Sequence, residues 1–123
     1  MGRKDSAVKF LKLAGFGQAD DAFKKFIAPS FIHHNQYFRG DRESLKSAMA
    51  EAHRTSPNEL IDVKRVFEDG DCVVTHSRVV RSKPGEPDIA VMHIFRFEGD
   101  KVAELWDLGQ LVDKNSPNEN GMF

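Results

Sequence analysis

The sequence contains a single cysteine, Cys72, among its 123 residues. One cysteine excludes a disulfide within the chain and a metal site built from several thiolates. Because Cys72 lies in the strand-like run D-C-V-V-T, we expect a small buried side chain rather than a reactive thiol. The chain also lacks a long apolar run, so we predict no signal peptide and no membrane span, and a cytoplasmic location is the default expectation.

An excess of charge of one sign is also missing. Lys and Arg number 18 against 19 Asp and Glu, and no basic cluster stands out. Nucleic-acid binding therefore has no electrostatic support, and we expect neither a nucleic-acid nor a membrane partner. Tyr and Trp occur once each, whereas Phe occurs ten times. So many Phe rings can line a core or an apolar ligand cavity.

The hydrophobic pattern changes near Pro57. Before it, apolar residues at helical spacing predict three helices, the third capped by Asp41, at about 6–14, 19–27 and 42–54. Ser6 is the expected N-cap of the first helix, Pro29 is expected to end the second, and residues 30–40 should be irregular or briefly extended. After Pro57, period-two alternation predicts four strands, at about 61–67, 72–81, 89–97 and 102–111.

Helices followed by an antiparallel meander indicate an α+β fold in one domain, residues 1–123. Helices would pack on one face of a curved sheet, and a sheet wrapped around them makes a cone. The inside of such a cone would serve as a ligand site.

The last predicted strand carries an unusual carboxylate. In V-A-E-L-W-D-L-G-Q-L, Asp107 follows Trp106, the only Trp, and shares a strand face with Ala103 and Leu105. A carboxylate on an apolar face must be paired, hydrated in a cavity, or held protonated. Asp107 is therefore the leading candidate for a functional residue.

The histidines are less specific. The turn at residues 98–100 makes the last two strands pair, but the sequence leaves open whether His93 lies beside Asp107. In the adjacent pair His33-His34, at least one side chain must point outward. Three histidines and a carboxylate could bind zinc or iron, but no H-x-H or H-E-x-x-H spacing supports a metal site. No G-x-S-x-G supports a serine hydrolase.

Two segments resemble the SnoaL-like proteins of the nuclear transport factor 2-like superfamily. F-I-H-H-N near residue 32, followed by G-D-R-E, is similar to that group's Y-I-Q-H-N-P…G segment. I-F-R-F-E-G-D-K-V-A-E-L-W-D-L-G-Q is similar to its D-I-F-R-x-E-x-G-K-I-x-E-H-W-D-x-x-Q run, and N-E-N-G-M-F looks like its ending. The resemblance covers about residues 7–123. It implies a cystatin-like α+β barrel, a cone-shaped curved antiparallel sheet wrapped around the N-terminal helices, usually dimeric, with a pocket inside the cone.

For some members the resemblance implies polyketide-cyclase or aldol-type activity without a metal or a cofactor, and Asp107 matches their general acid/base. His34, Asn35, His76 and Gln110 match pocket positions. The chain departs from the pattern twice: His93 stands where the group usually has Asp, and Leu105 where it usually has His.

Three functions stay open at this point. The first is a cofactor-independent cyclase or isomerase, in which Asp107 takes a proton next to a substrate carbonyl and polar groups bind the enolate oxygen. The expected catalytic residues are Asp107, His34 and His76. The expected ligand-binding residues are Asn35, His93, Trp106, Gln110 and Phe95.

The second function is a binding module that holds a small apolar ligand without turning it over, which the two departures favour. The third is association, most simply as a homodimer, through the apolar outer face of the sheet. The terminal Met122 and Phe123 either fray or fold back over the cone mouth or a partner subunit.

Overall fold

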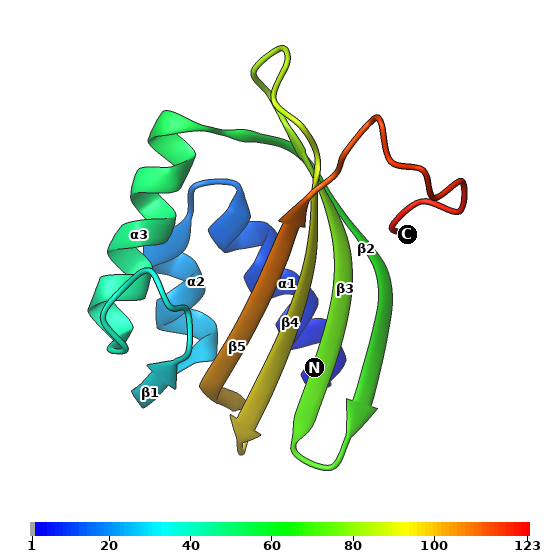
Figure 1. Cartoon of the computed structure of the whole chain (residues 1–123). Coiled ribbons are helices and arrows are strands. Elements are labelled where there is room, and N and C mark those ends of the chain that lie inside the picture. The colour runs from blue at the N-terminus through cyan, green and yellow to red at the C-terminus, as the bar shows by residue number, and fades with distance from the viewer. Residues whose placement is uncertain (1) are drawn as a thin grey trace.

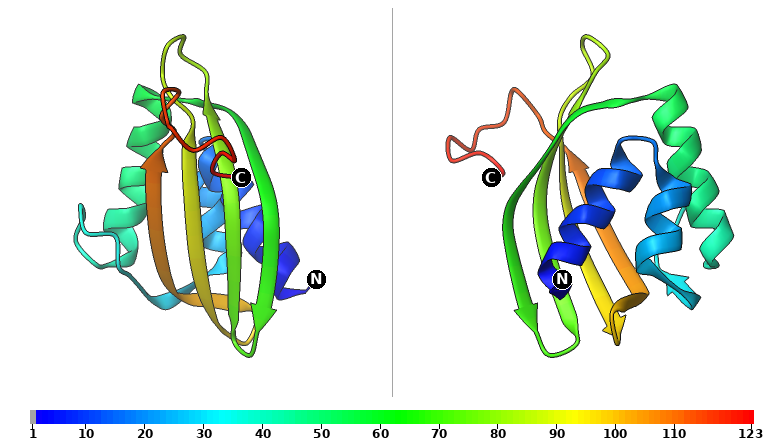
Figure 2. Two further views of the ribbon diagram at one scale, coloured as in Figure 1. Left: turned by 45° about the vertical axis from the view of Figure 1, so that its right-hand side comes forward. Right: turned by 180° about the vertical axis from the view of Figure 1, so that it is seen from behind.

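The computed structural model describes residues 2–123, which form three helices and one five-stranded sheet (Figure 1). In chain order the elements are α1 (Arg3–Gly15), α2 (Ala19–Phe26), β1 (Ile27–His33), α3 (Arg42–Thr55), β2 (Asn58–Asp69), β3 (Cys72–Arg81), β4 (Ile89–Glu98) and β5 (Lys101–Leu111). The strand order is β1-β5-β4-β3-β2. The sheet curves around the helices, which cover one face, and the C-terminal tail lies on the other side (Figure 2). The predicted α+β class is confirmed.

The three helices occur where the hydrophobic pattern predicts them, but two of the three residues expected to begin or end a helix do not do so. α1 begins at Arg3, so the prediction that Ser6 is its N-cap is wrong: Ser6 is buried inside the helix. α2 ends at Phe26 and the chain continues directly into β1, so Pro29 does not end the helix. The cap of α3 is confirmed, since the Asp41 carboxylate accepts a hydrogen bond from the Ser44 N–H at 3.0 Å.

The prediction of four strands is wrong because it omits β1. This strand pairs with β5 in parallel, with Ile27 opposite Val102 and His33 opposite Leu105. Its register shifts between Ile27 and Ile32, and it contains Pro29, which a sheet tolerates at its edge. β1 reaches only as far as Leu105, so the part of β5 from Trp106 onward pairs with β4 alone.

The core is built largely from Phe rings, as expected for so many of them. Phe10 of α1 makes edge-to-face contacts with Phe23 of α2 and Phe95 of β4, with ring centroids 5.5 and 6.1 Å apart. All three rings are buried, and the first contact joins α1 to α2 while the second attaches α1 to the concave face of the sheet. Truncating a buried Phe to Ala typically costs about 3–5 kcal/mol.

The hairpins occur where the sequence predicts them. β3 follows β2 after the turn at Gly70, and β5 follows β4 after the turn at Gly99, where both glycines have a positive φ of 58° and 62°. Cys72 begins β3 and is half-buried rather than fully buried. The Gly99 turn helps to set the register that aligns the residues of β4 and β5.

Candidate functional site

Three polar residues form a row across the inner face of the sheet. Thr75 of β3 lies opposite His93 of β4, and His93 lies opposite Asp107 of β5. Residues directly opposite on antiparallel strands have Cβ atoms about 4.5–5.5 Å apart. Thr75 and His93 are buried and Asp107 is half-buried. The structure thus answers the question of register: His93 and Asp107 are neighbours.

Asn35, in the loop after β1, holds the carboxylate of this row. Its Nδ2 donates to Asp107 Oδ2 at 3.2 Å. Asn35 is itself fixed, because its Oδ1 accepts from the Tyr37 N–H at 3.0 Å and its own N–H donates to His33 Nδ1 at 3.1 Å. Within residues 2–123, Asp107 Oδ1 makes no hydrogen bond, so it is free to accept one from a ligand.

His33 anchors this loop and was not singled out from the sequence. Its ring is buried, Nδ1 accepts from the Asn35 N–H, and Nε2 lies 2.6 Å from the Arg39 carbonyl oxygen. These partners assign a neutral ring with its proton on Nε2. Of the adjacent His33 and His34, the first therefore points inward and the second outward, as the sequence requires of at least one.

The buried His93 is neutral at physiological pH. Burial lowers the pKa of His93 from 6.5 to about 4, and the negative charge of Asp107 opposes this shift only in part. Its Nδ1 is buried and finds no hydrogen-bond partner in the described part of the chain. Phe95 stacks on the His93 ring at 5.7 Å and keeps it in place. The neutral His93 ring can therefore form a hydrogen bond with a ligand.

A half-open hollow of about 160 Å³, here called the inner cavity, lies beside this row. It lies between α1, α3 and the inner face of β2, β3 and β4, and its lining includes Leu11, Ala14, Met49, Ile61, Ser77 and His93. His93 is thus shared between the inner cavity and the polar row. Its other neighbour in the row, Asp107, lies outside the cavity lining.

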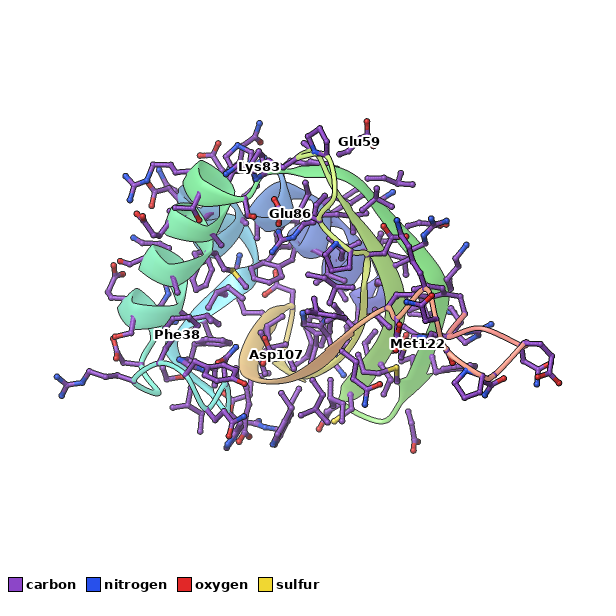
Figure 3. All side chains as sticks on the ribbon, turned by 45° about the horizontal axis from the view of Figure 1, so that its top comes forward. Phe38, Glu59, Lys83, Glu86, Asp107 and Met122 are labelled. Atoms are coloured by element: carbon purple, nitrogen blue, oxygen red, sulfur yellow. The ribbon has the colours of Figure 1, made fainter. Side chains whose placement is uncertain are left out.

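A second hollow, the outer groove, is much larger, at about 1090 Å³. It begins at the loop after β1 and passes the part of β5 that does not pair with β1. It then crosses the outer face of β4 and β3 to the C-terminal tail. It brings together the candidates Asp107, His34, Asn35, His76 and Gln110. Figure 3 shows Asp107 on β5 and Met122 on the C-terminal tail, on the opposite side of the sheet from α3. Asp107 therefore lies at the boundary between the groove and the inner face.

His34 and Trp106 form a paired cluster on the outer face. Their rings stack with centroids 4.8 Å apart, and His34 Nε2 lies 2.6 Å from a Glu104 carboxylate oxygen. Glu104 also accepts a hydrogen bond from Arg96 Nε at 2.9 Å. These two hydrogen bonds hold the pKa of Glu104 below its usual value. Trp106 thus packs on His34, and the structure does not bring either side chain to the inner row.

His76 lies farther along the outer face. It accepts a hydrogen bond from Arg65, and Phe123 stacks on its ring with centroids 5.8 Å apart. The terminal residue also lies 6.0 Å from the guanidinium of Arg78. The tail therefore folds back onto the outer face of its own sheet, and His76 is separated from the Thr75–His93–Asp107 row by the sheet itself.

Two further features concern metals and membranes. Across residues 2–123, no three His, Cys, Asp or Glu side chains gather in a way that could hold a metal ion. Over the same range, every helix is too short or too polar to cross a membrane.

Comparison with known proteins identifies the family. No curated protein matches the sequence. The solved structure of IdmH from Streptomyces antibioticus, a proposed polyketide cyclase, matches with a TM-score of 0.76 and 15% identity over 89% of this chain and 93% of that one. A proposed polyketide cyclase from Acidithiobacillus ferrooxidans matches with a TM-score of 0.72 and 19% identity, over 88% and 87% of the two chains.

An NTF-2-like protein of unknown function from Burkholderia xenovorans gives a TM-score of 0.69 and 15% identity, over 94% of this chain and 88% of that one. Identities this low show a shared fold. The sequence pattern of the SnoaL-like domain matches residues 10–105, most of the chain, and this protein therefore belongs to the SnoaL-like family.

Proposed function

We propose that this SnoaL-like protein binds a small carbonyl compound on the inner face of its sheet and that Asp107 is the general acid/base of an aldol-type cyclisation or an isomerisation. The observation that carries the proposal is the row of Thr75, His93 and Asp107, with Asn35 holding one carboxylate oxygen. The chemistry needs no metal or cofactor, because proton transfer alone can form an enolate.

In the proposed reaction, Asp107 Oδ1 removes a proton from the carbon next to the substrate carbonyl. The neutral His93 hydrogen-bonds the oxygen as negative charge develops on it, which lowers the barrier. The proton then returns from Asp107, either to another carbon of the enolate, giving an isomer, or to the alkoxide formed when the enolate attacks a second carbonyl. Asn35 keeps the carboxylate oriented throughout.

This mechanism gives His93 the role first considered for His34 and His76, because those two side chains lie on the outer face. Phe95 is fully buried under His93 and positions it rather than contacting the ligand. Gln110 lies on the outer groove, where it would contact only a part of the substrate that extends past the β5 edge.

The test is the exchange of ketone α-protons for deuterium, followed by NMR in deuterium oxide with cyclohexanone as the probe. The Asp107→Asn variant should lose at least about 100-fold of the catalysed rate, since general acid–base groups contribute about that much or more. Asp100→Asn, in the exposed β4–β5 turn, is the matched control and should keep the wild-type rate. An Asp107→Asn rate within tenfold of wild type would remove Asp107 from this role.

A non-catalytic binding module is the second candidate. Leu105 favours this candidate. It shares a strand face with Asp107 and is buried in the core, whereas the family resemblance leads us to expect a histidine at this position. In that case the wild-type protein would catalyse no exchange but would still carry a ligand. Native mass spectrometry of the purified protein distinguishes the two, because a retained small molecule without catalysed exchange supports binding alone.

We also propose that the outer face of the sheet forms a homodimer. The face exposes Met92, Ile94 and Leu108, which are 42%, 39% and 78% exposed. Contiguous exposed apolar side chains usually mark an interaction surface. Light scattering should give the mass of two chains for the wild type and of one chain for Leu108→Glu; a wild type that is monomeric at micromolar concentration contradicts this proposal.

A further inference from the structure

We infer that the inner cavity takes a compact ligand, about the size of one six-membered ring, that carries a hydrogen-bonding oxygen and no positive charge. This inference rests on the proposed function, because it names the class of carbonyl compound that would reach His93. Size, polarity and charge each support it separately.

The size limit comes from the volume and the walls of the cavity. Its volume is about 160 Å³, and an apolar cavity of about 150 Å³ is known to hold a benzene molecule. α1 and β2 lie close together beside the cavity: a Cβ placed on Gly15 would lie 2.1 Å from Ile61 Cδ1, the flexible end of that side chain. A fused-ring ligand exceeds the volume of the cavity and would have to displace lining side chains such as Ile61.

The polarity comes from buried groups that lack partners. Ser77 Oγ, His53 Nδ1 and His93 Nδ1 are buried, and each lacks a hydrogen-bond partner anywhere from residue 2 to residue 123. All three side chains line the inner cavity, and Ser77 is only 1% exposed. A buried polar group without a partner costs about 1–3 kcal/mol. A ligand oxygen at this point would recover part of that cost.

Ser77 and His93 are placed to share one oxygen. Ser77 lies opposite Val91, two residues before His93, so the two polar side chains are diagonal neighbours on the same face of β3 and β4. Diagonal neighbours lie within reach of longer side chains. An oxygen bonded to both would lie beside His93, whose neighbour on the next strand is Asp107.

The charge of the ligand follows from the lining. Within the described residues, neither Asp nor Glu lines the cavity, so nothing there compensates a cation. Arg81 is already bonded to Asn58 Oδ1 at 2.8 Å and to the Ser56 carbonyl oxygen at 2.9 Å. His93 is neutral because burial lowers its pKa. The cavity therefore suits a neutral ketone or alcohol and disfavours an amine.

The test of polarity uses a pair of probes with nearly the same shape, cyclohexanone and methylenecyclohexane, titrated into the protein and followed by NMR. Ser77→Ala should weaken cyclohexanone binding about tenfold, the effect of one lost hydrogen bond, and leave methylenecyclohexane binding unchanged. Ser47→Ala, on the exposed face of α3, is the matched control and should change neither. If Ser77→Ala changes both probes equally, or if cyclohexanone does not bind, the inference is wrong.

The test of size compares cyclohexanone with 2-decalone, which has two fused rings. The wild type should bind 2-decalone at least tenfold more weakly. Ala14→Leu, which adds volume to the cavity wall, should abolish cyclohexanone binding, and Ala52→Leu serves in its place if the first variant does not fold. Equal affinity for both ketones would overturn the size limit.

Failure of this inference and failure of the proposed function give different results. If Asp107→Asn abolishes exchange while Ser77→Ala has no effect on cyclohexanone binding, the general acid/base role stands and the ligand class is wrong. If Ser77→Ala weakens binding while Asp107→Asn exchanges at the wild-type rate, the ligand class stands and the catalytic role is wrong.

Discussion

On the outer face of β4 and β5, charged and polar side chains bond to one another: Glu104 accepts from Arg96 and lies against His34, which stacks on Trp106. On the inner face, Thr75, Ser77 and His93 are more deeply buried, yet Thr75 Oγ1, Ser77 Oγ and His93 Nδ1 have no partner in residues 2–123. Most buried polar groups in proteins have a hydrogen-bond partner, so an unpaired one calls for an explanation such as an ordered water, an ion or a bound ligand. The contrast supports the proposal that the inner residues bind a ligand and that the outer cluster is structural.

The largest expected effect is a difference between the two faces in how the free energy of unfolding depends on pH. Because the folded chain holds the pKa of His93 at about 4 instead of 6.5, the unfolded chain binds this proton first as the pH falls. The free energy of unfolding should be unaffected by His93 above pH 6.5 and fall by up to about 3 kcal/mol as the pH drops from 6.5 to 4. Denaturant unfolding at a series of pH values measures this slope.

The outer carboxylate behaves differently. The pKa of Glu104 is lowered by His34 and Arg96, so its contribution to stability is present above its ordinary value of 4.5 and is lost only as the pH falls through its lower folded value. His93→Leu should therefore flatten the slope between pH 6.5 and 4, whereas Glu104→Gln should keep it. The same slope in His93→Leu would assign the effect to another group.

The second prediction compares one histidine from each face. His93→Asn should lower the rate of α-proton exchange about 100-fold, because it removes the hydrogen bond to the developing oxyanion. His34→Asn, on the outer face, should change the rate less than threefold. A larger loss in His34→Asn than in His93→Asn would move the active site to the outer groove.

A smaller effect is expected from the loop that connects the two faces. His33→Leu removes the bonds of the buried ring to the Asn35 N–H and the Arg39 carbonyl, and it should lower the free energy of unfolding by about 2 kcal/mol. It should also lower the exchange rate, because Asn35 no longer holds Asp107. Thermal unfolding and the exchange assay measure both, with His34→Leu as the control, and an unchanged rate would show that Asn35 needs no such support.

The smallest effect is expected at the C-terminus. Deleting residues 121–123 removes the stacking of Phe123 on His76, which is worth about 0.5–1.5 kcal/mol. The inner cavity should be unaffected, so cyclohexanone should bind as it does to the intact chain. Weaker binding after the deletion would connect the outer tail to the inner site.

Much of the fold follows from local patterns. The three helices and β2 to β5 were predicted within a few residues, because each has a sustained period bounded by turn residues or a cap such as Asp41. β1 was missed because it is a short edge strand with a proline and a shifted register. Its inward His33, which anchors the loop beside Asp107, was missed together with it.

The sequence alone determined that Asp107 shares a face with apolar residues, since alternation along a strand is a local property. Only the tertiary structure decided which residues join it. Pairing across strands placed His93 opposite Asp107, and the packing of α1 and α3 on the sheet brought His53 and Ser77 to one cavity. His76 lies on the outer face because it alternates with the buried Thr75 and Ser77 along β3. Alternation separates the two faces of each strand, but strand register and helix packing arise from contacts between distant segments.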